Sequence, residues 1–108
     1  MTLSTQLSKD LISALKTKDT AKVSILRMIK AEIKNREIVK GQPLADDEVM
    51  AVLNSFVKKG RESIDQFTNA GREELASKEK EELEAVMSYL PEQLSEDDML
   101  PFYMLSSL

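Results

Sequence analysis

The sequence predicts an all-α fold, an antiparallel bundle of four main helices with a short helical or irregular C-terminal segment. Three observations support this prediction. Apolar residues recur at intervals of three and four, the period of a helix with one buried face. Gly41 and Pro43, then Gly71, then Pro91 interrupt this period where helices would end. No stretch shows the apolar and polar alternation of a half-buried strand.

The predicted helix over residues 46–70 is the element against which the others are expected to pack. One broad stripe of this helix carries its apolar side chains, Val49, Val52, Leu53, Phe56, Val57, Ile64 and Phe67. At a rise of about 1.5 Å per residue it is too long for one partner helix to cover. Gly60 lies near the middle of the stripe. It marks either a close helix crossing or, as we favour, a weak point that costs roughly 1 kcal/mol relative to Ala.

Two amphipathic helices are predicted before this central one. The first covers residues 2–17, with Thr2 or Ser4 as its N-cap. Its stripe contains Leu3, Leu7, Leu11, Ile12 and Leu15. The second covers residues 20–40, with Asp19 as its N-cap. Its apolar face contains Ile25, Leu26, Ile29 and Ile33.

The start of the central helix lacks a capping hydroxyl, because Ala45 stands in the capping position. The reciprocal capping box with Glu48 is then lost, and we expect Asp46 to cap the helix instead. A fourth helix is predicted over residues 72–89, ending before Pro91. Its stripe contains Leu75, Leu83, Val86 and Leu90.

Two carboxylates are out of place on this fourth helix. Glu79 and Glu82 project on the same side as its apolar stripe, where a charge must be paired or reach water. The short turn at residues 70–71 should make the last two helices antiparallel, which brings these carboxylates level with residues 59–63. We therefore predict a structural ion network rather than a catalytic carboxylate pair. Its members are Lys59, Arg61, Arg72, Glu79 and Glu82.

Composition excludes several kinds of chemistry. The chain has no Cys and no His, which removes disulfides, thiolate catalysis and the usual transition-metal ligands. No phosphate-binding glycine loop or other catalytic motif occurs, so we predict no catalytic residue, no metal and no cofactor. No secretory leader or apolar run long enough for a membrane span is present, and a soluble cytoplasmic protein is expected.

Charge is distributed unevenly along the chain. Residues 1–61 hold twelve Lys and Arg against seven Asp and Glu, whereas residues 62–108 hold three against twelve. On the second predicted helix a basic ridge is formed by Arg27, Lys30 and Lys34, and on the central helix Lys58 and Arg61 share an outward face. Such ridges bind phosphate backbones through charge, although ordinary solvated helices also carry them. Both interpretations remain open at this point.

Several segments resemble YqeY-like proteins. They are SILRMIKAEIKN at residues 24–35, KKGRESI at 58–64, NAGREEL at 69–75 and YLPEQLS at 89–95. Further matches are Phe67, the pair at residues 78–79 and the pair at residues 82–83. The resemblance extends over about residues 3–98. These proteins are similar in turn to the C-terminal accessory region of the B subunit of the glutamine-dependent tRNA amidotransferase.

The resemblance implies an N-terminal helical domain followed by a small helical tail domain. We place the first at residues 1–91 and the start of a missing tail at residues 92–108, where the sequence diverges after Asp98. Gly60 stands where this family usually has a longer basic or polar side chain. The apolar ending contains Met99, Leu100, Phe102, Tyr103, Met104, Leu105 and Leu108, and we expect it to promote self-association or to pack loosely.

The resemblance also implies a function. In the amidotransferase this region engages tRNA while the chemistry lies elsewhere, so the label of a carbon–nitrogen ligase with glutamine as amido donor would apply by homology alone. We expect a non-catalytic module that binds tRNA or supports the amidotransferase subunits. The alternative is a protein–protein interaction adaptor with no nucleic-acid role.

Overall fold

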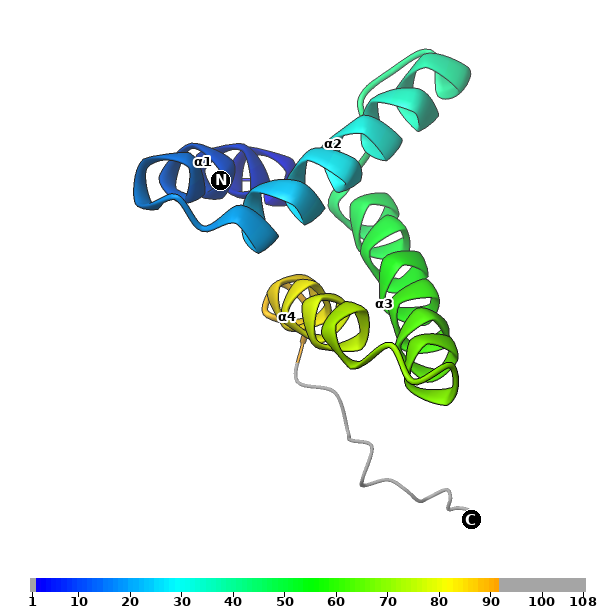
Figure 1. Cartoon of the computed structure of the whole chain (residues 1–108). Helices are drawn as coiled ribbons and strands as arrows, with labels where there is room; N and C mark the ends of the chain where they lie inside the picture. The colour runs from blue at the N-terminus through cyan, green and yellow to red at the C-terminus, as the bar shows by residue number, and fades with distance from the viewer. Residues whose placement is uncertain (1, 92–108) are drawn as a thin grey trace.

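The computed structural model describes residues 2–91 and confirms the all-α fold (Figure 1). Its four helices are α1 (Leu3–Thr17), α2 (Thr20–Lys40), α3 (Asp46–Asn69) and α4 (Glu73–Met87). No strand occurs within this described range. The fourth helix is slightly shorter at both ends than the predicted residues 72–89. The C-terminal segment expected at residues 92–108, with its apolar ending, lies outside the described residues.

Local capping chemistry determines where the first two helices begin and end. The hydroxyl of Thr2 accepts a hydrogen bond from the Thr5 N–H at 3.1 Å, and the carboxylate of Asp19 accepts one from the Lys22 N–H at 3.2 Å. These bonds confirm the predicted N-caps. Gly41 ends α2 in the left-handed conformation, with a φ of 83°. Glycine adopts this conformation without steric cost, as expected at this position.

The start of α3 differs from the prediction. Asp46 makes no cap for its own helix; its carboxylate accepts a hydrogen bond from the Leu3 N–H of α1 at 3.1 Å. The Ala45 N–H donates to the carboxylate of Glu48 at 2.8 Å, so half of the capping box survives. Lys40 also donates to Glu48, and these two bonds hold the pKa of Glu48 below its ordinary value.

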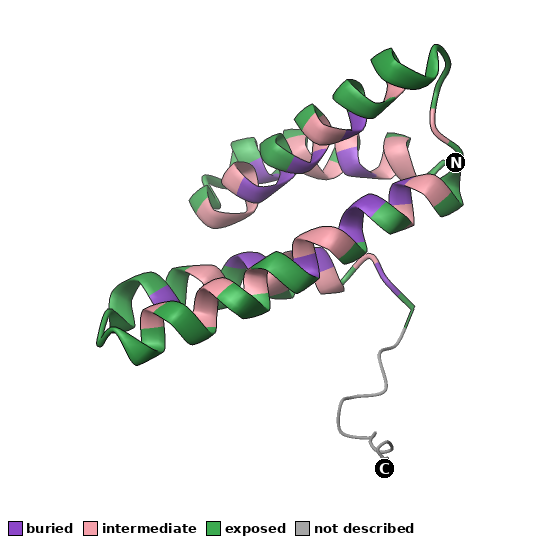
Figure 2. Cartoon of the chain, turned by 90° about the vertical axis from the view of Figure 1, so that its right-hand side faces the viewer, coloured by how far each residue is buried: buried purple, intermediate pink, exposed green. Residues whose placement is uncertain are grey.

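The helices form two hairpins, α1–α2 and α3–α4, whose buried sides face each other (Figure 2). The core between them is aliphatic and consists of Leu7, Ile25, Leu26, Ile29, Ile33, Val49, Val52, Leu53, Val57, Val86 and Leu90. Helix α3 contacts each of the other three helices, as predicted, but α2 does so as well, and the two helices share the central position. The most extensive neighbour of α3 is α4.

Gly60 lies on the side of α3 that faces α4. A methyl group added there would meet the Leu83 side chain at 3.5 Å, an ordinary van der Waals distance. Helix α4 therefore passes opposite Gly60 but leaves room for a methyl group, which supports the interpretation of a weak point. Near the N-terminal end of α4, Leu75 is 36% exposed although its spacing predicts a buried residue.

A long-range hydrogen bond connects the segment after α4 to α1. The Tyr89 hydroxyl donates to one carboxylate oxygen of Asp10, and the Gln6 side-chain amide donates to the other at 2.9 Å. Burial raises the pKa of the Tyr89 phenol, and the adjacent Asp10 carboxylate raises it further. This contact joins the first helix to the end of the described chain, and the sequence pattern did not predict it.

Candidate binding cleft between helices α2, α3 and α4

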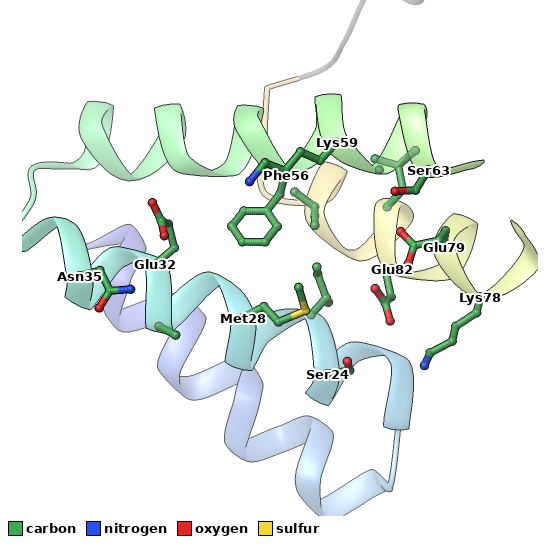
Figure 3. Close-up of a pocket in the computed structure, with 15 residues that line it drawn as sticks. Ser24, Met28, Glu32, Asn35, Phe56, Lys59, Ser63, Lys78, Glu79 and Glu82 are labelled. Atoms are coloured by element: carbon green, nitrogen blue, oxygen red, sulfur yellow. The ribbon is translucent and has the colours of Figure 1, made fainter. Parts of the chain in front are cut away.

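A cleft of about 620 Å³ opens between α2 and the α3–α4 hairpin (Figure 3). Helices α2, α3 and α4 all contribute side chains to its lining. Its apolar part includes Ile25, Met28, Phe56, Leu83 and Val86. The polar part includes Ser24, Glu32, Asn35, Lys59, Ser63, Lys78, Glu79 and Glu82. A concave surface that combines apolar side chains with polar and charged ones is a candidate binding site.

Glu82 is the unusual residue of this cleft. It is only 7% exposed, and its carboxylate has no hydrogen bond or ion pair to another side chain within the described residues. Burial raises the pKa of Glu82 and the neighbouring negative charge of Glu79 raises it further, although the positive charge of Lys78 partly offsets this rise. Figure 3 shows its carboxylate directed away from α4 toward the side of the cleft where Ser24 lies. The helical period correctly placed Glu82 on the inward side of its helix.

The predicted ion network does not form as direct ion pairs. Lys59, Glu79 and Glu82 do line the same cleft, at the level expected from an antiparallel α3–α4 hairpin. However, the amine of Lys59 extends along the cleft away from both carboxylates (Figure 3). Arg61 and Arg72 are exposed and lie outside the lining. Within residues 2–91 the ion pairs closer than 4.0 Å are Arg36–Glu32 and Lys40–Glu48.

The predicted nucleic-acid-binding residues lie elsewhere on the surface. Arg27 and Lys34 are exposed on the side of α2 that faces away from the core. Lys30, between them in sequence, is half-buried and donates to the Ser8 hydroxyl of α1. Lys58 and Arg61 are exposed on the outer side of α3. Of the three residues of the predicted basic ridge, Arg27 and Lys34 are thus exposed to solvent, whereas Lys30 is directed toward α1.

Most of the cleft was not predicted from the sequence. Its α2 wall contains Ser24, Met28, Glu32 and Asn35, whose spacing of four, four and three gives one helical stripe beside the core stripe. The sequence alone could have revealed that stripe on α2. It could not show that α3 and α4, which come later in the chain, lie opposite the stripe and complete the cleft. No group of three or more acidic, His or Cys residues that could hold a metal ion occurs within residues 2–91. None of the described helices is long and apolar enough to cross a membrane.

Comparison with known proteins identifies the family. The YqeY-like protein family matches residues 4–103, so the chain belongs to this family of helical proteins. The chain is 35% identical over 85 residues to the mitochondrial protein "Altered inheritance of mitochondria protein 41" of Eremothecium gossypii, covering 78% of this chain and 46% of that protein. The corresponding Candida glabrata protein is 36% identical over 80% of this chain and 48% of its own length.

A third relative, uncharacterized protein C22F3.15 of Schizosaccharomyces pombe, is 30% identical over 81% of this chain and 71% of its own length. The chain spans about half the length of the two proteins named above. Their names also correct one expectation. Relatives named as mitochondrial conflict with a purely cytoplasmic assignment. The assignment was wrong because a helical domain of this composition is compatible with more than one compartment.

Proposed function

We propose that the chain is a non-catalytic RNA-binding module that engages tRNA, and so supports tRNA amidotransferase, through the outer face of α2. The observation that carries the proposal is the pair Arg27 and Lys34, exposed on one side of that helix. They are seven positions apart, which is about 10 Å along a helix. Neither side chain forms an ion pair with a carboxylate in the described part of the chain. Both cations are therefore available to phosphate groups.

The charge of the surrounding hairpin supports this proposal. Residues 3–40 contain nine Lys and Arg against four Asp and Glu, a net charge of +5. Residues 46–87, which form the other hairpin, contain six against eleven, a net charge of −5. A polyanion is attracted to the first hairpin and repelled by the second, so RNA should approach from the α1–α2 side.

The test is charge reversal of the exposed pair. Arg27→Glu with Lys34→Glu should greatly weaken binding of unmodified tRNA, measured by fluorescence anisotropy at low salt, while the circular dichroism spectrum stays the same. The logarithm of the binding constant falls linearly with the logarithm of the salt concentration. Loss of two phosphate contacts should make this dependence less steep by about two. Lys30 is left intact because its replacement would also remove the contact with Ser8.

The matched control is Arg72→Glu with Lys80→Glu, which makes the same change in charge at two exposed positions of the α3–α4 hairpin. This control should bind tRNA with an affinity much closer to that of the parent. Equal losses in the two double variants would mean that net charge alone attracts RNA. Unchanged binding in the folded α2 variant would contradict the proposed function.

A second candidate function is a protein–protein adaptor, and the cleft between α2, α3 and α4 favours it. An apolar groove with a buried carboxylate suits a protein side chain better than a phosphate. The two functions use different surfaces and can be tested separately.

A further inference from the structure

The cleft between α2, α3 and α4 contains a carboxylate whose bonding capacity is unused. Glu82 is 7% exposed and lines the cleft without a hydrogen-bonding partner among the described residues. A buried acceptor without a donor destabilises a fold, and a charged one does so most. Such a group is retained at low cost only where something else supplies the donor. Within the cleft, Glu82 is therefore an acceptor open to a donor that a ligand brings.

The charges around Glu82 specify what that ligand should carry. Glu79 is one helical turn away on the same wall, and it too has no basic partner within 4.0 Å in the described residues. The amine of Lys59 points away from both carboxylates (Figure 3), and Lys78 of the same cleft forms no ion pair with either one within 4.0 Å. Two neighbouring carboxylates on one wall match a guanidinium, which offers several N–H donors in one plane. A phosphate would be repelled at the same place.

The length of the cleft specifies the rest of the ligand. On α2 the lining extends from Ser24 to Asn35, eleven residues apart, or about 16 Å at the helical rise. This is about three turns of a helix and is too long for a single small cation to occupy. Met28 is 51% exposed at the cleft, and Phe56 is half-buried beside it. Exposed apolar side chains along a groove of this length are the features that an amphipathic helix uses to dock.

We propose that this cleft docks an amphipathic helix of a partner protein, which places apolar side chains on Met28, Phe56 and Leu83 and an arginine on Glu82. The arginine would neutralise the acidic end of the cleft, and the apolar residues would cover the rest of its lining. This site is separate from the outer face of α2. The proposal does not depend on RNA binding.

The test uses a display library of randomised helical peptides of about three turns, selected against the full chain. Selected peptides should carry an arginine flanked by apolar residues at helical spacing. Glu82→Gln should weaken them about 10- to 100-fold, the loss expected when a charge-assisted hydrogen bond is removed. The matched control is Glu84→Gln, which removes a carboxylate from an exposed position on the other side of α4 and should leave affinity unchanged.

A second variant keeps the test decisive if Glu82→Gln alters the fold. Met28→Lys adds a cation at a half-exposed position of the same cleft, and it should also weaken the arginine peptides. The proposal is overturned if neither variant lowers the affinity for any selected peptide. It is also overturned if the selected peptides lack a basic residue. It is also overturned if sedimentation shows self-association that Glu82→Gln abolishes, because the occupant would then be a second copy of the chain.

Discussion

The two hairpins of this domain have the same secondary structure and opposite charge. Hairpin α1–α2 carries a net charge of +5 over residues 3–40, and hairpin α3–α4 carries −5 over residues 46–87. Their buried sides share one aliphatic core, and within residues 2–91 one ion pair, Lys40–Glu48, joins α2 of the basic hairpin to α3 of the acidic hairpin. Apart from this pair, the charged side chains of the two hairpins form no ion pair with each other in the described residues, so most of the charge difference is available for binding.

The two hairpins also present two different kinds of surface. The basic hairpin presents its cations outward, as Arg27 and Lys34 show. The acidic hairpin turns Glu82 inward, toward a cleft shared with α2. One surface suits a polyanion and the other suits a cationic side chain, so the same small fold offers two sites of opposite preference.

The largest expected effect tests whether the hairpins fold as one unit. Leu26 of α2 and Leu53 of α3 are both fully buried in the shared core. Replacing either with Ala should lower the free energy of unfolding by about 3 kcal/mol, from lost burial plus the remaining cavity. Urea melts followed by circular dichroism should show a single transition in both variants. A second transition in Leu26→Ala, with α3–α4 still folded, would show that the hairpins are independent.

The next effect concerns the contact between the hairpins at Tyr89. Tyr89→Phe removes the hydrogen bond to Asp10 and should cost about 1–2 kcal/mol in urea melts. Because the pKa of Tyr89 is raised above 10.0 in the folded protein, its contribution is complete below that pH and is lost as the pH rises further. The Phe variant should therefore lose less stability than the parent above pH 10. Equal stability of the two proteins at pH 7 would show that the contact is not a stabilising one.

A smaller effect of opposite sign is expected inside the acidic hairpin. Gly60→Ala should raise the free energy of unfolding by about 0.5–1 kcal/mol, because alanine has the higher helix propensity. The added methyl group would meet Leu83 at an ordinary contact distance. Thermal melts measure the change. A lower melting temperature would mean that α3 and α4 need the close approach that glycine allows.

The smallest effect is the pH dependence that Glu82 gives to stability. Its pKa in the folded protein is raised above the ordinary value of 4.5, so the folded state binds this proton more readily than the unfolded state. Stability should fall as the pH rises from 4.5 through the raised pKa. Glu82→Gln should therefore unfold at a higher urea concentration than the parent at pH 7, and this advantage should shrink toward pH 4.5. The control Glu84→Gln should stay within about 0.5 kcal/mol of the parent.

The elements themselves could be predicted from the sequence because local chemistry determines them. Thr2, Asp19 and Gly41 act on backbone groups within a few residues, and the apolar period identifies the inward side of each helix. Asp46 was assigned wrongly for the opposite reason. Its hydrogen-bonding partner, Leu3, lies 43 residues away in the sequence, and no local rule identifies such a partner.

The sequence predicted which side of α4 carries Glu82 but not which side chains surround it. The helical period placed Glu82 inward, and the short α3–α4 turn predicted its level along α3. The pairing of Glu79 and Glu82 with cations failed because opposite charges at the same level need not point toward each other, as Lys59 shows. The contact between Tyr89 and Asp10 spans 79 residues and requires the packed structure to be seen.

We propose that the two hairpins divide binding between them, with RNA on the outer face of α2. A titration of isotopically labelled full chain with tRNA, followed by backbone amide shifts, tests it most directly. We expect the largest shifts on α2 around Arg27 and Lys34, while the amides of α4 barely move. Largest shifts along α4, or saturating tRNA with no shift on α2, would contradict it.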